Sequence, residues 1–194
     1  SAHGEMRPFG DGAERSGPGE GLEGGDLCTF MAHHAHLFND SNVGWWVDQI
    51  QGGAGRFGEM SMIFEDDMPS ATPKDMSHSR VFRGVGWAGL HSNLLDSKND
   101  TCMIFKSSPF GSVSHSHADQ NAFAIMKGGT ALAIPSGHYG PAYSQRHHAE
   151  WTRSSKANNC VLVNGEGQNI REARAHGRIV TFEDAPGFTY LKGD

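Results

Sequence analysis

Residues 120–136, QNAFAIMKGGTALAIPS, decide the fold class of this chain. Two short apolar runs flank Gly128-Gly129. A pair of glycines is typical of the two-residue turn of a β-hairpin, because glycine takes positive φ angles without steric cost. We therefore predict strands over residues 120–128 and 130–136, joined by a tight turn.

Other parts of the second half show the same pattern of short apolar runs between turn residues. The further strand candidates are residues 80–90, 102–108, 159–165, 177–184 and 187–193. Asn164-Gly165 predicts a second tight turn. Glycine accounts for 26 of the 194 residues, which also favours turns over long helices. Together these features predict an antiparallel β-sandwich or barrel.

The residues before the strands have a helical spacing of apolar side chains. This spacing begins after Asp26, a good N-cap residue, and predicts helices over residues 26–38 and 42–51, the second capped by Ser41 or Asn42. The pattern changes near residue 76, so we expect a helical part over 1–76 and a β-rich part over 77–194. The last strand candidate ends beside Asp194 without a closing element, and we expect a chain truncated at both ends.

The two parts differ in charge. Residues 1–76 carry 4 Lys and Arg against 13 Asp and Glu, a balance of −9, whereas residues 77–194 carry 12 against 9, a balance of +3. An anionic ligand would be attracted to the second part, although a solvated acidic surface explains the first part equally well. The three cysteines form no CxxC pair, and no apolar run approaches the ~20 residues of a membrane span. We expect no membrane span and no nucleic-acid partner.

Residues 112–123, SVSHSHADQNAF, place His115, His117 and Asp119 at alternate positions. On a strand these side chains would share one face, either as a solvated polar surface or as part of a site. A second polar cluster, GHYGPAYSQRHHAEWTR at residues 137–153, follows one hairpin later. Two polar clusters beside apolar strands favour a cleft.

Two metal chemistries fit part of this pattern. A cupin-type site would combine the HxH with a second motif around residues 129–138, but Asn121 and Ala122 stand where a glutamate is expected. An iron site of two histidines and one carboxylate would combine His117 and Asp119 with a distant histidine such as His176. Many short sequences contain an HxD by chance, so neither alternative is favoured.

Four longer motifs occur in order over about residues 78–168: RVFRGVGWAGLHS, FKSSPFGSVSHSHADQNAF, GGTALAIPSGHY and HHAEWTRSSKANNCVLVNGEGQ. Together they resemble the start of the C-terminal β-sandwich of heparinase II/III-like polysaccharide lyases, a family that includes oligoalginate lyases. The preceding helices resemble the last part of the (α/α) toroid of that family. The resemblance implies a mainly β chain, with the end of a toroid over 1–76 and an incomplete β-sandwich over 77–194.

The function implied by this resemblance is cleavage of a uronic-acid-containing polysaccharide, of the alginate or glycosaminoglycan type, by β-elimination. Such a site must neutralise the uronate carboxylate, supply a base and protonate the leaving oxygen. His115 matches a histidine of the family's cleft, and Tyr139 falls near a cleft tyrosine, with Tyr143 as a second candidate. The expected substrate contacts are His147, His148, Trp151, Arg153, Asn158 and Gln168. A β-sandwich module that binds an acidic glycan without cleaving it is the alternative.

The family's metal position is altered in this chain. His117 matches a zinc-binding histidine of relatives, and Asp119 is a neighbouring candidate, but Pro135 and Asn158 stand where relatives have Asp and His. A proline side chain cannot bind a metal, and asparagine is a poor zinc ligand. The sequence thus predicts no certain cofactor. Zinc is the metal to test, and we do not expect a site of the family type to retain it stoichiometrically.

The rest of the implied catalytic machinery lies upstream. In the family, the principal Asn or His and Tyr catalytic groups belong to toroid helices, most of which precede the part matched by this chain. We expect the 194 residues alone to have little or no activity. Family members are commonly periplasmic or secreted, and the resemblance implies the same location here.

Overall fold

The computed structural model describes Phe9 and residues 26–51, 68–136 and 145–194. These residues belong to two compact units. One contains the helices and the segment up to Ser77, and the other contains Phe9 and the residues from His78 onward. Within the described ranges, no helix is both long and apolar enough to cross a membrane.

The helical unit contains α1 (Asp26–Phe38) and α2 (Ser41–Gln51), so both predicted helices are confirmed. Its core consists of the buried residues Ala32, Ala35, Val47 and Met68. The predicted cap at Ser41 or Asn42 is wrong by one or two residues. The Asp40 carboxylate accepts hydrogen bonds from the backbone N–H groups of Asn42, at 3.0 Å, and Val43, at 3.2 Å, and so caps α2.

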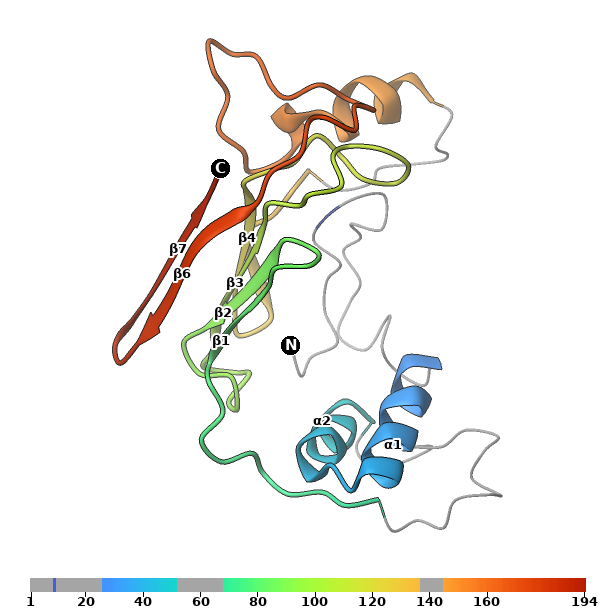
Figure 1. Ribbon diagram of the computed structural model, residues 1–194, viewed down its shortest axis with the longest axis vertical. Helices are drawn as coiled ribbons and strands as arrows, with labels where there is room; N and C mark the ends of the chain where they lie inside the picture. The colour runs from blue at the N-terminus through green and yellow to red at the C-terminus, as the bar shows by residue number, and fades with distance from the viewer. Residues whose placement is uncertain (1–8, 10–25, 52–67, 137–144) are drawn as a thin grey trace. The chain divides into compact units, whose positions relative to one another are not determined.

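The second unit consists mainly of antiparallel strands, as predicted (Figure 1). The strands are β1 (Ser79–Phe82), β2 (Trp87–His91), β3 (Thr101–Lys106), β4 (Ala122–Lys127), β5 (Thr130–Ala133), β6 (Ile179–Ala185) and β7 (Phe188–Gly193). The first five form one sheet in chain order, and β6 and β7 form a separate hairpin. Consecutive strands of the sheet are therefore antiparallel neighbours, and the longest connection within it, residues 107–121, joins β3 to β4.

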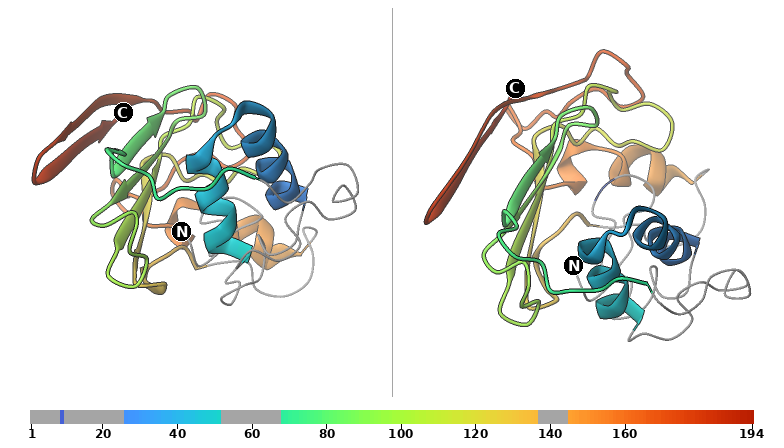
Figure 2. Two further views of the ribbon diagram at one scale, coloured as in Figure 1. Left: turned by 90° about the horizontal axis from the view of Figure 1, so that it is seen from below. Right: turned by 60° about the horizontal axis from the view of Figure 1, so that its bottom comes forward.

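The hairpin packs against the five-stranded sheet. A core of Ala88, Phe105 and Ile179 joins them, and the partly buried side chains around it are Val81, Leu90, Met103, Phe123, Phe182 and Leu191. Both views of Figure 2 show the five-stranded sheet between this hairpin and the helical turns η2 (His148–Thr152) and η3 (Ser155–Ala157). The hairpin thus packs against one face of the sheet, and Arg153, directly after η2, contacts the loop of the candidate site.

Residues 80–90 form two strands and not the single strand predicted. The chain reverses after Phe82 and returns at Trp87, opposite it. Gly86 has a φ of +70°, and a Cβ atom there would overlap the carbonyl oxygen of Ser107. Only glycine fits this turn, which places β2 beside β3.

The predicted strand at residues 159–165 is wrong. Val161 and Val163 are 80% and 71% exposed, so this apolar run buries no face. One isolated bridge, between Val163 and Glu166, closes a turn at Asn164-Gly165, where both residues have positive φ. The predicted turn is therefore confirmed, as is the Gly128-Gly129 turn between β4 and β5.

Candidate functional site

Residues 112–121 form an irregular loop between β3 and β4, so the predicted strand through His115, His117 and Asp119 is wrong. Ser114 and Asn121 have φ angles of 54° and 58°, which a β-strand does not accommodate. The three side chains consequently share no face. His115 is exposed, whereas His117 and Asp119 are 2% and 0% exposed.

Arg153 holds this loop in place from the end of η2. Its guanidinium donates hydrogen bonds to the backbone carbonyls of Ser112, at 3.4 Å, of Ser114, and of Ser116, at 2.9 Å. Its own carbonyl accepts one from Ala118 N at 2.9 Å. Because Ser114 and Ser116 flank His115, the buried Arg153 fixes the backbone that presents this histidine.

His115 lines a pocket with a volume of about 400 Å³. The apolar lining is Phe9, Val85, Trp87, Phe110 and Val113, and the polar lining is Lys106, His115 and the serines 108, 114 and 116. The Phe9 and Trp87 rings meet edge to face, with centroids 5.2 Å apart. An apolar wall beside hydroxyls, an imidazole and an ammonium group suits a ligand that has both apolar faces and anionic groups.

The ammonium group in this pocket is already neutralised. Lys106 Nζ is paired with Asp119 Oδ1 and lies 5.9 Å from the centroid of the Phe9 ring. Both side chains of the pair are almost fully buried. His115 is consequently the pocket's exposed ionisable group and the one best placed to meet a ligand.

The remaining predicted contacts lie outside the lining of this pocket. His147, directly before η2, and Trp151, within it, are exposed. His148 is buried, and its ring centroid lies 6.1 Å from that of His117. Their contacts with substrate stay predictions. Tyr139 and Tyr143 lie outside the described residues.

Asn158 and Gln168 have structural partners. Asn158 Nδ2 donates to Ser154 O at 2.8 Å. Gln168 and Gln120 exchange two hydrogen bonds of 2.7 and 2.9 Å, which tie the segment after the Asn164-Gly165 turn to the start of β4. These bonds position the loops around the pocket, and direct sugar contacts by the two side chains stay predictions.

The residues at the family's metal position do not fit a zinc ion. Pro135 offers no ligand, the Asn158 amide is bonded to a backbone carbonyl, and Asp119 is paired with Lys106. The residues of the alternative iron site do not come together either, because His176 is exposed on another loop while His117 is buried. The second motif of the cupin alternative includes His138, which lies outside the described residues. We therefore assign no metal chemistry to these residues.

Most of the pocket wall was not predictable from the sequence. Trp87 and Lys106 are opposite each other at the ends of β2 and β3, a pairing that depends on strand register. Phe9 comes from far upstream in the chain. The predicted strand over residues 102–108 included Lys106, but nothing in the sequence indicated its buried partner.

The family model described as "Heparinase II/III-like, C-terminal" matches residues 74–191, more than half of the chain. This chain belongs to that family. The match covers β1 to β6 and most of β7, together with the loop that presents His115 and the residues that hold it. No curated protein matches the chain.

Solved structures confirm the fold of this family member. The heparan sulfate lyase HepC from Pedobacter heparinus is 15% identical, with a TM-score of 0.68, and 100% of this chain is covered but 26% of that chain. The heparinase III BT4657 gene product is also 15% identical, with a TM-score of 0.67 and coverage of 99% and 26%. A third structure, titled heparinase III, is 16% identical with a TM-score of 0.60 and coverage of 93% and 25%. The chain thus spans about a quarter of each neighbour's length.

Proposed function

We propose that this chain is part of a polysaccharide lyase that cleaves a uronic-acid-containing polysaccharide by β-elimination. The observation that carries the proposal is the position of His115, which is exposed on a pocket wall within the segment that matches the heparinase II/III-like family. The structural neighbours named as heparan sulfate lyase and heparinase III support an acidic polysaccharide as substrate. A periplasmic or secreted location stays a prediction.

The pocket supports this proposal through its chemistry. Trp87 and the other apolar side chains offer a surface to the apolar face of a sugar ring, and the hydroxyls of Ser114 and Ser116 offer partners for sugar hydroxyls. His115 is the side chain that would contact the uronate carboxylate. Lys106 adds little net charge, because Asp119 neutralises it.

In the proposed reaction, a base removes the proton on the carbon next to the carboxylate. The bond to the 4-linked oxygen then breaks, a carbon–carbon double bond forms, and the leaving oxygen takes up a proton. A hydrogen bond from His115 to the carboxylate would strengthen as negative charge builds up on its oxygens, which lowers the barrier. We assign His115 this stabilising role, and we expect the base to come from the part of the family's catalytic machinery that precedes the segment matched here.

The experiment that tests the function is an ultraviolet assay for the unsaturated uronate product. The full-length protein would be incubated with heparan sulfate, a second glycosaminoglycan and alginate separately. We expect absorbance to rise with at least one of them. A hydrolase would shorten the chains without this absorbance, and that result would refute β-elimination.

The same samples distinguish a lyase from a binding module. The binding of each of these polysaccharides to the full-length protein would be measured by calorimetry. Saturable binding of an acidic polymer with no unsaturated product over a long incubation would indicate a module that binds but does not cleave.

A further inference from the structure

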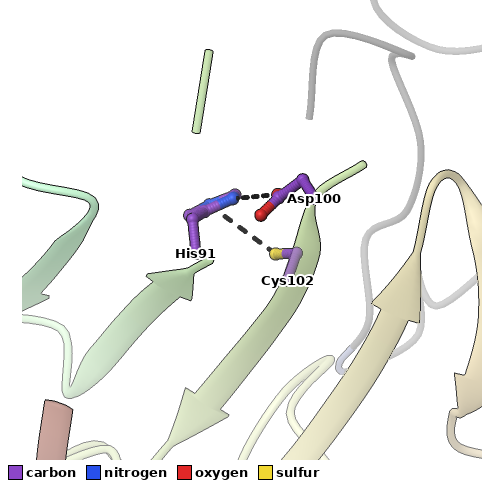
Figure 3. A group of neighbouring side chains, drawn as sticks. All are labelled: His91, Asp100 and Cys102. Carbon is purple, nitrogen blue, oxygen red and sulfur yellow. Dashed lines mark hydrogen bonds and ion pairs between the residues drawn. The ribbon is translucent and has the colours of Figure 1, made fainter. Parts of the chain in front are cut away.

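His91, Asp100 and Cys102 gather an imidazole, a carboxylate and a thiol at one end of the five-stranded sheet (Figure 3). His91 at the end of β2 is opposite Cys102 on β3, and Asp100 precedes β3 by one residue. Each of the three offers a ligand atom, and these atoms all lie within 4.8 Å of one another. This group lies outside the lining of the His115 pocket.

The hydrogen bonds orient the imidazole. His91 Nδ1 lies 2.5 Å from Asp100 Oδ2, so the carboxylate favours the tautomer with its proton on Nδ1. The other oxygen, Asp100 Oδ1, accepts from Asn93 N at 2.9 Å and from Ser92 Oγ at 3.3 Å. The carboxylate is thereby fixed, and the lone pair of His91 Nε2 is available towards Cys102 Sγ, 3.6 Å away.

A second histidine lies beside this group. His91 N donates to His78 O at 3.0 Å, which continues the β1–β2 pairing by one residue. His78 and His91 both line a pocket of about 600 Å³ that also includes Asp184 and Thr189. The imidazole of His91 is therefore reachable from this pocket.

A nucleophilic role for the thiol is not supported. Cys102 is 4% exposed and does not line the pocket, and burial raises its pKa to about 11. An attacking cysteine needs both access and a populated thiolate. A metal ion needs only a path to the imidazole and the displacement of one proton from the thiol.

We propose that His91 Nε2 and Cys102 Sγ bind a divalent metal ion of the zinc class, with Asp100 holding the imidazole in place. Their separation of 3.6 Å fits one edge of a tetrahedral site, for which zinc–nitrogen and zinc–sulfur bond lengths give roughly 3.5 Å. A carboxylate that accepts the other ring N–H of a metal-binding histidine is a common arrangement around zinc. On binding, the metal replaces the Cys102 thiol proton, which passes to solvent. Water completes the coordination.

This site differs from the family-type position around His117. The two use different residues from different segments, so substitutions separate them cleanly. The proposal is also independent of the lyase reaction, because its readout is the metal's own spectrum.

The test is a titration of the metal-free protein with Co²⁺, which gives a near-ultraviolet thiolate-to-cobalt absorption band when a cysteine binds it. We expect a saturable band at one Co²⁺ per chain, abolished by Zn²⁺ and absent in Cys102→Ser. His91→Ala should weaken binding at least ~10-fold, and Asp100→Asn should weaken it ~10- to 100-fold. Cys160→Ser and His117→Ala serve as matched controls and should keep the band.

Three results would overturn the proposal. They are no band in the folded wild type at saturating Co²⁺, a band that persists in Cys102→Ser, and a band that is lost in His117→Ala. Circular dichroism of each metal-free variant shows whether it folds. If Cys102→Ser does not fold, the Co²⁺ affinity of Asp100→Asn tests the proposal instead. Wild-type affinity in a folded Asp100→Asn variant would contradict the role given to the carboxylate.

Discussion

Lys106 and Asp119 form an ion pair in which the side chains are 4% and 0% exposed. Lys106 ends β3, and Asp119 belongs to the loop that leads to β4. The pair therefore anchors the loop that carries His115 to the end of β3, the central strand of the sheet. Oδ1 of the carboxylate is paired with the lysine, and the charge of this lysine opposes a metal cation beside Asp119.

Removing one partner of this pair should destabilise the fold strongly, because the other charge stays buried without compensation. We expect Asp119→Asn to lower the free energy of unfolding in urea by about 3–5 kcal/mol. The matched control is Glu150→Gln, which removes the exposed partner of Arg146 and should leave the unfolding midpoint nearly unchanged. Equal effects of the two substitutions would contradict the structural role of the buried pair.

Arg153 should control the order of the His115 loop. Lysine keeps the charge but cannot reproduce the planar guanidinium that reaches the carbonyls of Ser112, Ser114 and Ser116. We expect Arg153→Lys to speed amide hydrogen exchange in residues 112–118 by at least ~10-fold. Arg174→Lys, at an exposed arginine beside Glu172, is the control. Unchanged exchange in the loop would show that Arg153 does not hold it.

The turn between β1 and β2 offers a pair of matched glycines. An alanine at Gly86 meets a positive φ and the Ser107 carbonyl, whereas an alanine at Gly84 has no atom within 4 Å of its Cβ. We expect Gly86→Ala to lower the free energy of unfolding by about 1–3 kcal/mol. Gly84→Ala should have little effect. Similar unfolding midpoints for the two variants would mean that β2 does not approach β3 as described.

Asp100 should make stability depend on acid pH. Burial alone would raise the pKa of Asp100, but hydrogen bonds from Asn93 N and His91 outweigh it and hold the pKa below its usual 3.8. Ionised Asp100 therefore stabilises the fold at pH values above about 4, and this contribution is lost as the pH falls through the lowered pKa. With a chelator present to keep both proteins metal-free, Asp100→Asn should have a lower free energy of unfolding than wild type at pH 7. A gap in unfolding free energy that does not narrow in acid would contradict this.

The parts of the fold that were predictable from sequence depend on local signals. The spacing of apolar residues after Asp26 gave both helices, and Gly128-Gly129 marked the β4–β5 turn, because helices and tight turns are set by neighbouring residues. The apolar run at 159–165 wrongly predicted a strand, because its valines are exposed. An apolar run predicts a strand only where a partner strand covers it.

The candidate site was less predictable because distant residues determine it. The 112–121 loop is held by Arg153, more than thirty positions later, and the spacing of His115 and His117 contains no trace of that contact. The same holds for His91 and Cys102, which meet through the β2–β3 register. His115 itself was identified from the family resemblance, and its exposure on a pocket is what supports the prediction.

The role of His115 is the central claim, and the rate of unsaturated uronate formation by His115→Ala in the full-length protein tests it most directly. Loss of the proposed hydrogen bond to the carboxylate should lower kcat ~100-fold or more, with a smaller change in KM. His176→Ala removes an exposed histidine outside the pocket lining and should cleave at the wild-type rate. A His115→Ala enzyme as fast as wild type would contradict the account.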